Sequence, residues 1–150
     1  MSPHKYCYDY PRPAVGADCV IIDRARKEIL LIERKNEPYK AMWALPGGFV
    51  EENETVEAAA IRELEEEARL TGISLHLLGV FSDPGRDPRG RIITLAYVAF
   101  VEKHDLNPVA GDDAKNVKWF SIDNLPQIAF DHSEIIRQAM EMPVRMSSDH

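Results

Sequence analysis

The chain has 150 residues, 45% of them hydrophobic and 29% charged, a composition typical of one globular domain, which we expect to span residues 1–150. Its net charge of -7 argues against a protein that binds nucleic acid or anionic membranes in general, because such proteins need basic patches. Two cysteines exclude a disulfide framework, and no apolar run is long enough to cross a bilayer. Without a recognisable signal sequence, the expected location is cytoplasmic.

The element pattern predicts an α/β (α+β) fold with a mixed sheet packed against helices. Residues 1–13 form an extended, proline-bearing lead-in, and 143–150 form a C-terminal tail. Runs of β-branched and other apolar residues predict strands at 14–23, 28–34, 74–81, 91–102 and 116–122. Helical patterns cover 55–70, with Thr55 as N-cap, and 131–142, with Asp131 or Ser133 as cap. The segment from 35 to 48 is predicted as a loop ending in a Pro-Gly-Gly breaker.

The first predicted helix carries a dense group of carboxylates. Glu63, Glu66 and Glu67 fall within an arc of about 100°, whereas Glu65 points away from them. Such like charges repel one another, so the pattern is most often only a solvated surface. It also suits a hard divalent cation, which prefers carboxylate and carbonyl oxygens.

The residues around this helix decide between the two interpretations. The segment from Gly48 to Leu70 resembles the Nudix box, GX5EX7REUXEEXGU, in which U is a bulky aliphatic residue. The matching fixed positions are Gly48, Glu54, Arg62, Glu63, Leu64, Glu66, Glu67 and Leu70. The one departure is Arg69, where the box has its last glycine.

On these positions the chain is identified as a member of the Nudix family, and "WALPGGFVE" and "WFSIDNLP" are also similar to it. The resemblance covers most of residues 14–142. It implies an α/β/α sandwich with a mixed sheet between helices. It also implies hydrolysis of a nucleoside diphosphate linked to another group.

The resemblance also implies the roles of individual residues. Mg2+ is the expected cofactor, with Mn2+ as a substitute. Its ligands are the Gly47 carbonyl, Glu63, Glu66 and Glu67. The general base is Glu63 or Glu66, or else an acidic residue of a later loop, which here offers Asp112 and Asp113. Glu54 and Arg62 are expected to form a structural ion pair.

The substrate class depends on a second segment, "FSDPGRDPRGRIITLAY". It places Arg86, Arg89 and Arg91 around a tight loop, where guanidinium groups suit phosphate oxygens. The alternative is a solvated turn in which these arginines pair with Asp83 and Asp87.

This segment and "FDHSEII" are similar to ADP-ribose pyrophosphatases and to ADP-ribose-sensing Nudix domains. The resemblance implies cleavage of ADP-ribose to AMP and ribose 5-phosphate. The predicted substrate-binding residues are Arg34, Gly48, Phe81, Arg86 and Arg89. Trp43, Phe81 and Phe130 are candidates for stacking on adenine, although such aromatics more often belong to a core.

Two other functions stay open. One is a MutT-like nucleoside triphosphate pyrophosphohydrolase, and the other is a non-catalytic ADP-ribose sensor. The intact acidic positions of the box favour an enzyme over a sensor. A small-molecule nucleotide is the expected partner, with no nucleic acid and no membrane, and analogy with relatives favours a homodimer.

Arg69 carries one further expectation. The glycine that usually stands there ends the helix in the left-handed conformation, which arginine resists. We therefore expect the helix to run on to about Leu70, with Thr71 and Gly72 ending it.

Overall fold

A computed structural model describes residues 6–143. Residues 1–5 of the expected lead-in (1–13) and 144–150 of the expected tail (143–150) lie outside the described residues. Seven strands make one sheet: β1 (Ala14–Asp23), β2 (Glu28–Arg34), β3 (Trp43–Ala44), β4 (Gly47–Phe49), β5 (His76–Phe81), β6 (Ile92–Phe100) and β7 (Ala114–Ser121). The helices are α1 (Val56–Ala68) and α2 (His132–Met140), with short 3-10 turns at Lys103–Asp105 and Ile122–Asn124. No helix within the described part of the chain is long and apolar enough to cross a membrane.

The sheet is mixed, as the sequence predicts. Its main order is β3-β2-β1-β6-β5, and β4 also pairs with β1 while β7 pairs with β2. The β1–β6 pair is parallel and the other pairs are antiparallel. Strand β1 is therefore central. Its residues from Gly16 to Asp23 are buried, whereas Ala14 is exposed and Val15 is partly buried.

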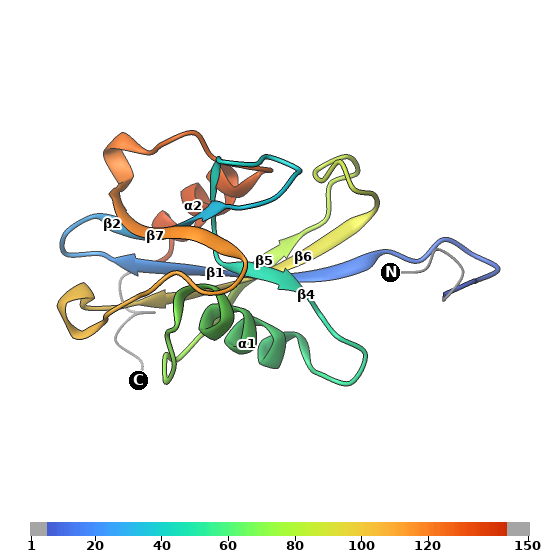
Figure 1. The fold of residues 1–150 in the computed structure, drawn as a ribbon, viewed down its shortest axis with the longest axis horizontal. Coiled ribbons are helices and arrows are strands. Elements are labelled where there is room, and N and C mark those ends of the chain that lie inside the picture. Colours follow the sequence, from blue (N-terminus) through green and yellow to red (C-terminus); the bar gives the residue numbers. More distant parts are fainter. Residues whose placement is uncertain (1–5, 144–150) are drawn as a thin grey trace.

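The two helices lie on opposite faces of this sheet, with α1 below it and α2 above it in the view of Figure 1. Alternation along β1 explains the two cores, because successive side chains of a strand point to opposite faces. Ala17, Cys19 and Ile21 belong to the core cluster that includes α1, whereas Val20 and Ile22 belong to the one that includes α2. The expected α/β/α sandwich is confirmed.

Helix α1 begins as predicted and ends earlier than predicted. The Thr55 hydroxyl accepts a hydrogen bond from the Ala58 N–H, which is an N-cap. At the other end Arg69 is left-handed, with φ 56°, and its N–H donates to the Glu65 carbonyl. The expectation that the helix continues to Leu70 is therefore wrong.

The reason lies in a distant loop that packs on the end of α1. The Val109 N–H donates to the Ala68 carbonyl, and the Gly111 N–H donates to the Glu67 carbonyl, both at 3.0 Å. These bonds satisfy carbonyls that a helix end leaves without partners. The Arg69 side chain also bonds the Asp112 carboxylate at 3.1 Å. These tertiary contacts outweigh the cost of a left-handed arginine.

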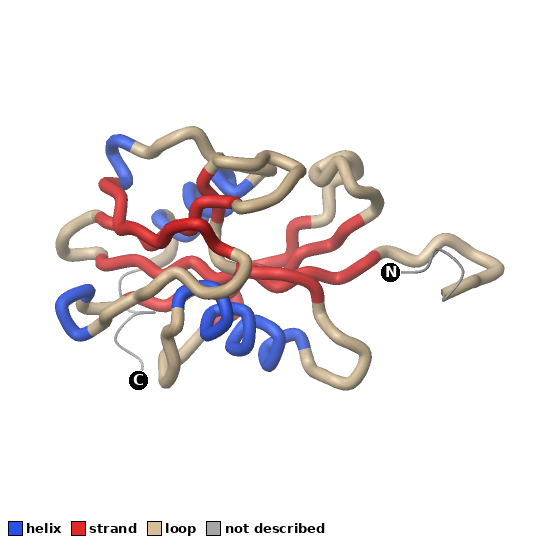
Figure 2. The backbone as a smooth tube through the Cα atoms, viewed as in Figure 1, coloured by secondary structure: helices blue, strands red, loops and turns tan. Residues whose placement is uncertain are grey.

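The short strands β3 and β4 lie in the segment predicted as a loop. Strand β4 pairs with the first half of β1, placing Gly47 opposite Asp18 and Gly48 opposite Ala17. Figure 2 shows how these short strands interrupt the loops on one side of the sheet. This pairing fixes the Gly47-Gly48 backbone against the second half of α1, where Glu63 and Glu67 lie, and so positions the site described next.

Candidate active site

The acidic face of α1 is organised around Arg62. Its guanidinium forms two bonds to the Glu54 carboxylate, at 2.6 and 3.1 Å, so the expected pair between loop and helix is present. It also bonds Glu63 at 2.7 Å and Glu66 at 3.1 Å. One arginine thereby holds these carboxylates together and reduces the repulsion that their spacing creates.

Glu67 lies beneath the Gly47-Gly48 segment of strand β4. Its carboxylate accepts a hydrogen bond from the Gly47 N–H at 2.7 Å, and only 7% of the residue is exposed. Burial raises the pKa of Glu67 to about 8, and the neighbouring Glu63, Asp18 and Asp113 carboxylates act in the same direction. Burial also raises the pKa of Glu63, although Arg62 opposes that shift.

The contacts of Gly47 and Gly48 show why this part of β4 requires glycine. A Cβ atom built on Gly48 would lie 2.5 Å from the Cδ atom of Glu63. One built on Gly47 would lie 2.0 Å from Asp18 Oδ1. The backbone therefore approaches the carboxylates more closely than any other residue type allows.

The donor set fits a divalent cation. It consists of hard oxygens, and the buried carboxylate of Glu67 lies among other carboxylates that supply no compensating charge. Within residues 6–143, no group of three or more His, Cys, Asp and Glu side chains already converges as a metal site. Arg62 instead bonds both Glu63 and Glu66, so a cation would take these carboxylates from Arg62.

The later loop brings one of its two predicted acidic residues to this face. Asp113 lines a hollow together with Glu63, Glu67 and the Gly47-Gly48 segment of β4. Asp112 is bonded to Arg69, and its side chain is 84% exposed. The geometry therefore brings Asp113, and not Asp112, to the acidic face.

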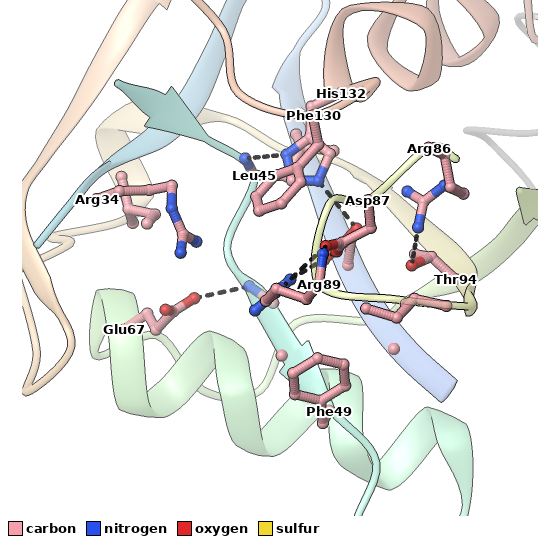
Figure 3. Close-up of a pocket in the computed structure, with 16 residues that line it drawn as sticks. Arg34, Leu45, Phe49, Glu67, Arg86, Asp87, Arg89, Thr94, Phe130 and His132 are labelled. Atoms are coloured by element: carbon pink, nitrogen blue, oxygen red, sulfur yellow. Dashed lines mark hydrogen bonds and ion pairs between the residues drawn. The ribbon is translucent and has the colours of Figure 1, made fainter. Parts of the chain in front are cut away.

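A second pocket adjoins this hollow and shares Arg34, Arg89, Glu67 and the two glycines with it. It lies between β1, the loop after β5 and the start of α2, and Figure 3 shows Arg89 in it between Phe49 and Phe130. The Arg89 guanidinium carbon is 4.8 Å from the Phe49 ring centre and 5.1 Å from that of Phe130. These distances allow cation–π contact with both rings.

Arg34 supplies a second cation to this pocket. Its Nε–H donates to the Pro38 carbonyl at 2.7 Å, and its guanidinium carbon lies 5.0 Å from the Phe130 ring centre. Among residues 6–143 no carboxylate forms an ion pair with it. Burial and the positive charge of Arg89 lower the pKa of Arg34, which shows that its charge is poorly compensated. An anion bound here would compensate it.

Arg86 lies at the pocket wall but has a structural environment. Its side chain is 4% exposed and forms two bonds with Asp131, at 2.6 and 2.8 Å, and one with Thr94. This guanidinium therefore ties the loop after β5 to the start of α2. Arg91 donates to the Ser82 carbonyl instead of entering the pocket.

Two of the three candidate stacking aromatics are elsewhere. Phe81 is buried in the core cluster beneath α2, and Trp43 packs edge-to-face on Phe120. Neither lines the pocket, so of the three only Phe130 remains in position to stack on a base. The anticipated pairing of the loop arginines is present in part, because Arg89 forms two bonds with Asp87.

Several pocket residues were not predicted as site residues, among them three that carry an aromatic ring or a titratable group. Phe49, Asp18 and His132 all line the pocket. Asp18 stands alone within an apolar strand, so no spacing signals its role. Phe49 directly follows the two glycines, and His132 belongs to "FDHSEII", so their neighbourhood was the only available signal.

Comparisons with known proteins agree with this arrangement. The family model for the NUDIX domain matches residues 12–139. An ADP-ribose pyrophosphatase of Methanocaldococcus jannaschii is 49% identical over 131 residues, which are 87% of this chain and 75% of the relative.

Two solved structures are similar in fold and sequence. The NUDIX domain of Shewanella oneidensis NrtR, in complex with ADP ribose, has a TM-score of 0.82 at 27% identity, covering 94% of this chain and 98% of that one. The bifunctional NMN adenylyltransferase/ADP ribose pyrophosphatase of Francisella tularensis, in complex with AMP and a Mn ion, has a TM-score of 0.76 at 35% identity. Here the match covers 89% of this chain and 43% of the larger protein. With the box residues in place on α1, these matches show that the chain belongs to the Nudix hydrolase family.

Proposed function

We propose that this protein is an ADP-ribose pyrophosphatase, which uses Mg2+, or Mn2+ in its place, to hydrolyse ADP-ribose to AMP and ribose 5-phosphate. The observation that carries the proposal is the position of the Gly47-Gly48 segment of strand β4. This segment lines both the acidic hollow and the neighbouring pocket, and Arg34, Arg89 and Glu67 line both as well. A diphosphate lying against it would therefore meet two guanidinium groups beside the carboxylates that would hold the cation.

The roles of the acidic residues follow from their positions. Glu63, Glu66 and Glu67, with the Gly47 carbonyl, would hold the cation. When bound, it supplies positive charge that neutralises the pyrophosphate and makes water more acidic. Glu63, Glu66 or Asp113 then accepts the proton of the attacking water. The exposed Asp112 is held by Arg69 and takes no part in this step.

The pocket residues bind and orient the substrate. Arg34 and Arg89 hold phosphate oxygens, because guanidinium groups match them in charge and in hydrogen-bond geometry. Phe130 and Phe49 offer ring faces for the adenine. Gly48 lets the Glu63 carboxylate lie directly against the β4 backbone, next to the bound substrate. Orientation of this kind raises the rate by holding the reacting groups in line.

A hydrolysis screen with Mg2+ tests the proposal. The substrates are ADP-ribose, NADH, nucleotide sugars, diadenosine polyphosphates and nucleoside triphosphates. ADP-ribose is expected to give the highest kcat/KM, with AMP and ribose 5-phosphate as products. A higher value for a triphosphate would instead indicate a MutT-like enzyme.

A second candidate is an ADP-ribose sensor, since the S. oneidensis NrtR domain binds ADP ribose. Tight binding of ADP-ribose without turnover in the presence of Mg2+ would favour it. The complete set of acidic box residues favours hydrolysis.

A further inference from the structure

Asp18 is a buried carboxylate in the wall of the pocket that holds Arg34 and Arg89. It lies on the face of β1 that turns toward α2, and 8% of the residue is exposed. Its Oδ2 atom is 3.3 Å from Nε2 of His132, which is also buried. Neither residue has a role in the hydrolysis described above.

The hydrogen bonds of His132 define which of its nitrogens faces Asp18 as a donor. The Leu45 N–H donates to His132 Nδ1 at 3.1 Å, and Figure 3 shows this bond beside the Phe130 ring. Because Nδ1 accepts, the ring proton is on Nε2. A neutral imidazole therefore turns its Nε2–H edge toward Asp18 Oδ2, at 3.3 Å.

The neighbouring strand β4 leaves room for the Asp18 carboxylate. Asp18 pairs with Gly47 across β1 and β4, and a Cβ on Gly47 would overlap Asp18 Oδ1. Glycine at position 47 lets the carboxylate lie beside the segment of β4 that borders both the pocket and the acidic hollow. His132 therefore contacts the carboxylate on one side, and Gly47 leaves the space that the carboxylate occupies on the other.

This environment leaves the carboxylate short of donors. A carboxylate has about four acceptor positions, and within residues 6–143 His132 supplies the one side-chain contact to it. Burying an anion with so few hydrogen bonds is costly unless a ligand provides more. A phosphate would be repelled, whereas a hydroxyl group can donate to it. Adjacent hydroxyls on one sugar can donate to both oxygens.

We propose that Asp18, positioned by His132, accepts hydrogen bonds from the hydroxyls of a ribose in the bound substrate. This inference rests on the proposed function, since it places the sugar next to a diphosphate held by Arg34 and Arg89. ADP-ribose contains two riboses, one in its AMP half and one in its ribose 5-phosphate half. The hydroxyl chemistry is the same for both, so the experiment must separate them.

The two reaction products make that separation possible, because they bind without turning over. Binding of AMP and of its dideoxy analogue is measured by calorimetry in the presence of Mg2+, and binding of ribose 5-phosphate is compared with that of deoxyribose 5-phosphate. For the wild type, one pair should show a preference of about tenfold for the ligand with hydroxyls. The pair that shows it identifies which ribose Asp18 binds.

Asp18→Asn should reduce that preference to about twofold or less, and Asp18→Ala, which removes every acceptor, should abolish it. Asp123→Asn is the matched control, because Asp123 is exposed and, among residues 6–143, its carboxylate pairs only with Lys27. It should preserve the wild-type preference. His132→Asn keeps an acceptor for the Leu45 N–H, but its side chain is too short to place a donor at Asp18 as well. It should weaken the preference less than Asp18→Asn does.

Two results would overturn the inference. One is an unchanged hydroxyl preference in both Asp18 variants. The other is a loss of Mg2+ affinity in Asp18→Asn without nucleotide, which would place Asp18 in the metal site. The screen of substrates with the wild type tests the proposed function separately, because turnover of ADP-ribose does not depend on the outcome for Asp18.

Discussion

At the scale of single residues, the structure separates the three candidates for the general base. Glu63 is bonded to Arg62 and is mostly buried, Glu66 is half exposed, and Asp113 borders the same hollow without an ion pair among the described residues. A base that accepts the proton of water contributes about 10²–10⁴ to the rate. Its loss should lower kcat without weakening the metal site.

Glu63→Gln, Glu66→Gln and Asp113→Asn therefore form a diagnostic set. We expect one variant to lose at least about a hundredfold in kcat while keeping its Mg2+ affinity, measured by calorimetry. A variant that loses both has lost a metal ligand. Equal activity of all three with the wild type would contradict the assignment of the acidic face. Asp112→Asn is the control and should keep wild-type kcat, since Asp112 faces solvent.

Arg69 gives a second prediction at this scale, because it is left-handed and its ion pair with Asp112 is exposed. Arg69→Gly removes backbone strain but also removes that pair and frees the unfolded chain, and these effects nearly cancel. The free energy of unfolding should change by less than about 1 kcal/mol, measured in urea. Arg69→Val should cost about 1–2 kcal/mol, because a β-branched residue tolerates this conformation poorly. Equal stability of the two variants would contradict the argument.

At the scale of elements, the loop that follows β6 acts as the C-terminal cap of α1 and carries Asp113. A Cβ on Gly111 would lie 1.6 Å from the Glu66 carbonyl oxygen, so any side chain must push the loop from the helix. Gly111→Ala should therefore break the bonds that Gly111 and Val109 make to α1. Asp113 would move away from the acidic face with them.

We expect Gly111→Ala to lower the free energy of unfolding by about 2–4 kcal/mol and to reduce kcat at least tenfold in the protein that remains folded. Chemical unfolding and steady-state kinetics measure the two effects. Gly79→Ala is the matched control, because a Cβ there would meet only the Phe81 ring at 3.9 Å. If Gly111→Ala matched this control, the loop would not be held as described.

These elements also show what the sequence could and could not predict. The local pattern predicted the start of α1, its cap at Thr55 and the shared face of its three glutamates, because these depend on residues close in sequence. It placed the end of the helix too late. The bounds of β1 and β2 were also predicted correctly. Strands β3 and β4 were missed because two or three residues carry no periodic signal, and their pairing depends on distant partners.

The errors within the site have the same origin. Arg69 is left-handed because residues forty positions later satisfy the helix end, which local propensity cannot reveal. Phe81 was predicted to bind substrate, but it is buried in the core beneath α2. Arg86 does line the pocket, and its bonds to Asp131 could not be predicted because they join segments far apart in the sequence. Asp18 was missed because one acidic residue in an apolar strand has no pattern.

At the scale of the whole molecule, Glu67 couples stability to pH and to the cation. Burial raises its pKa to about 8 in the folded protein, whereas a glutamate in the unfolded chain has a pKa of about 4.3. Between these values the folded state binds more protons than the unfolded state. The free energy of unfolding should therefore be fully supported by this group at low pH and fall as pH rises toward 8.

Thermal unfolding in the presence of a chelator measures this effect. The Tm of the wild type should fall by more than about 4 °C between pH 6 and pH 8 relative to Glu67→Gln, whose amide oxygen can still accept from the Gly47 N–H. Mg2+ binds the deprotonated carboxylate, so it should raise the Tm of the wild type more at pH 8 than at pH 6. Parallel pH profiles of the wild type and Glu67→Gln would show that Glu67 is ionised throughout. In that case its buried charge would be compensated without the cation, and the case for Glu67 as a ligand would be lost.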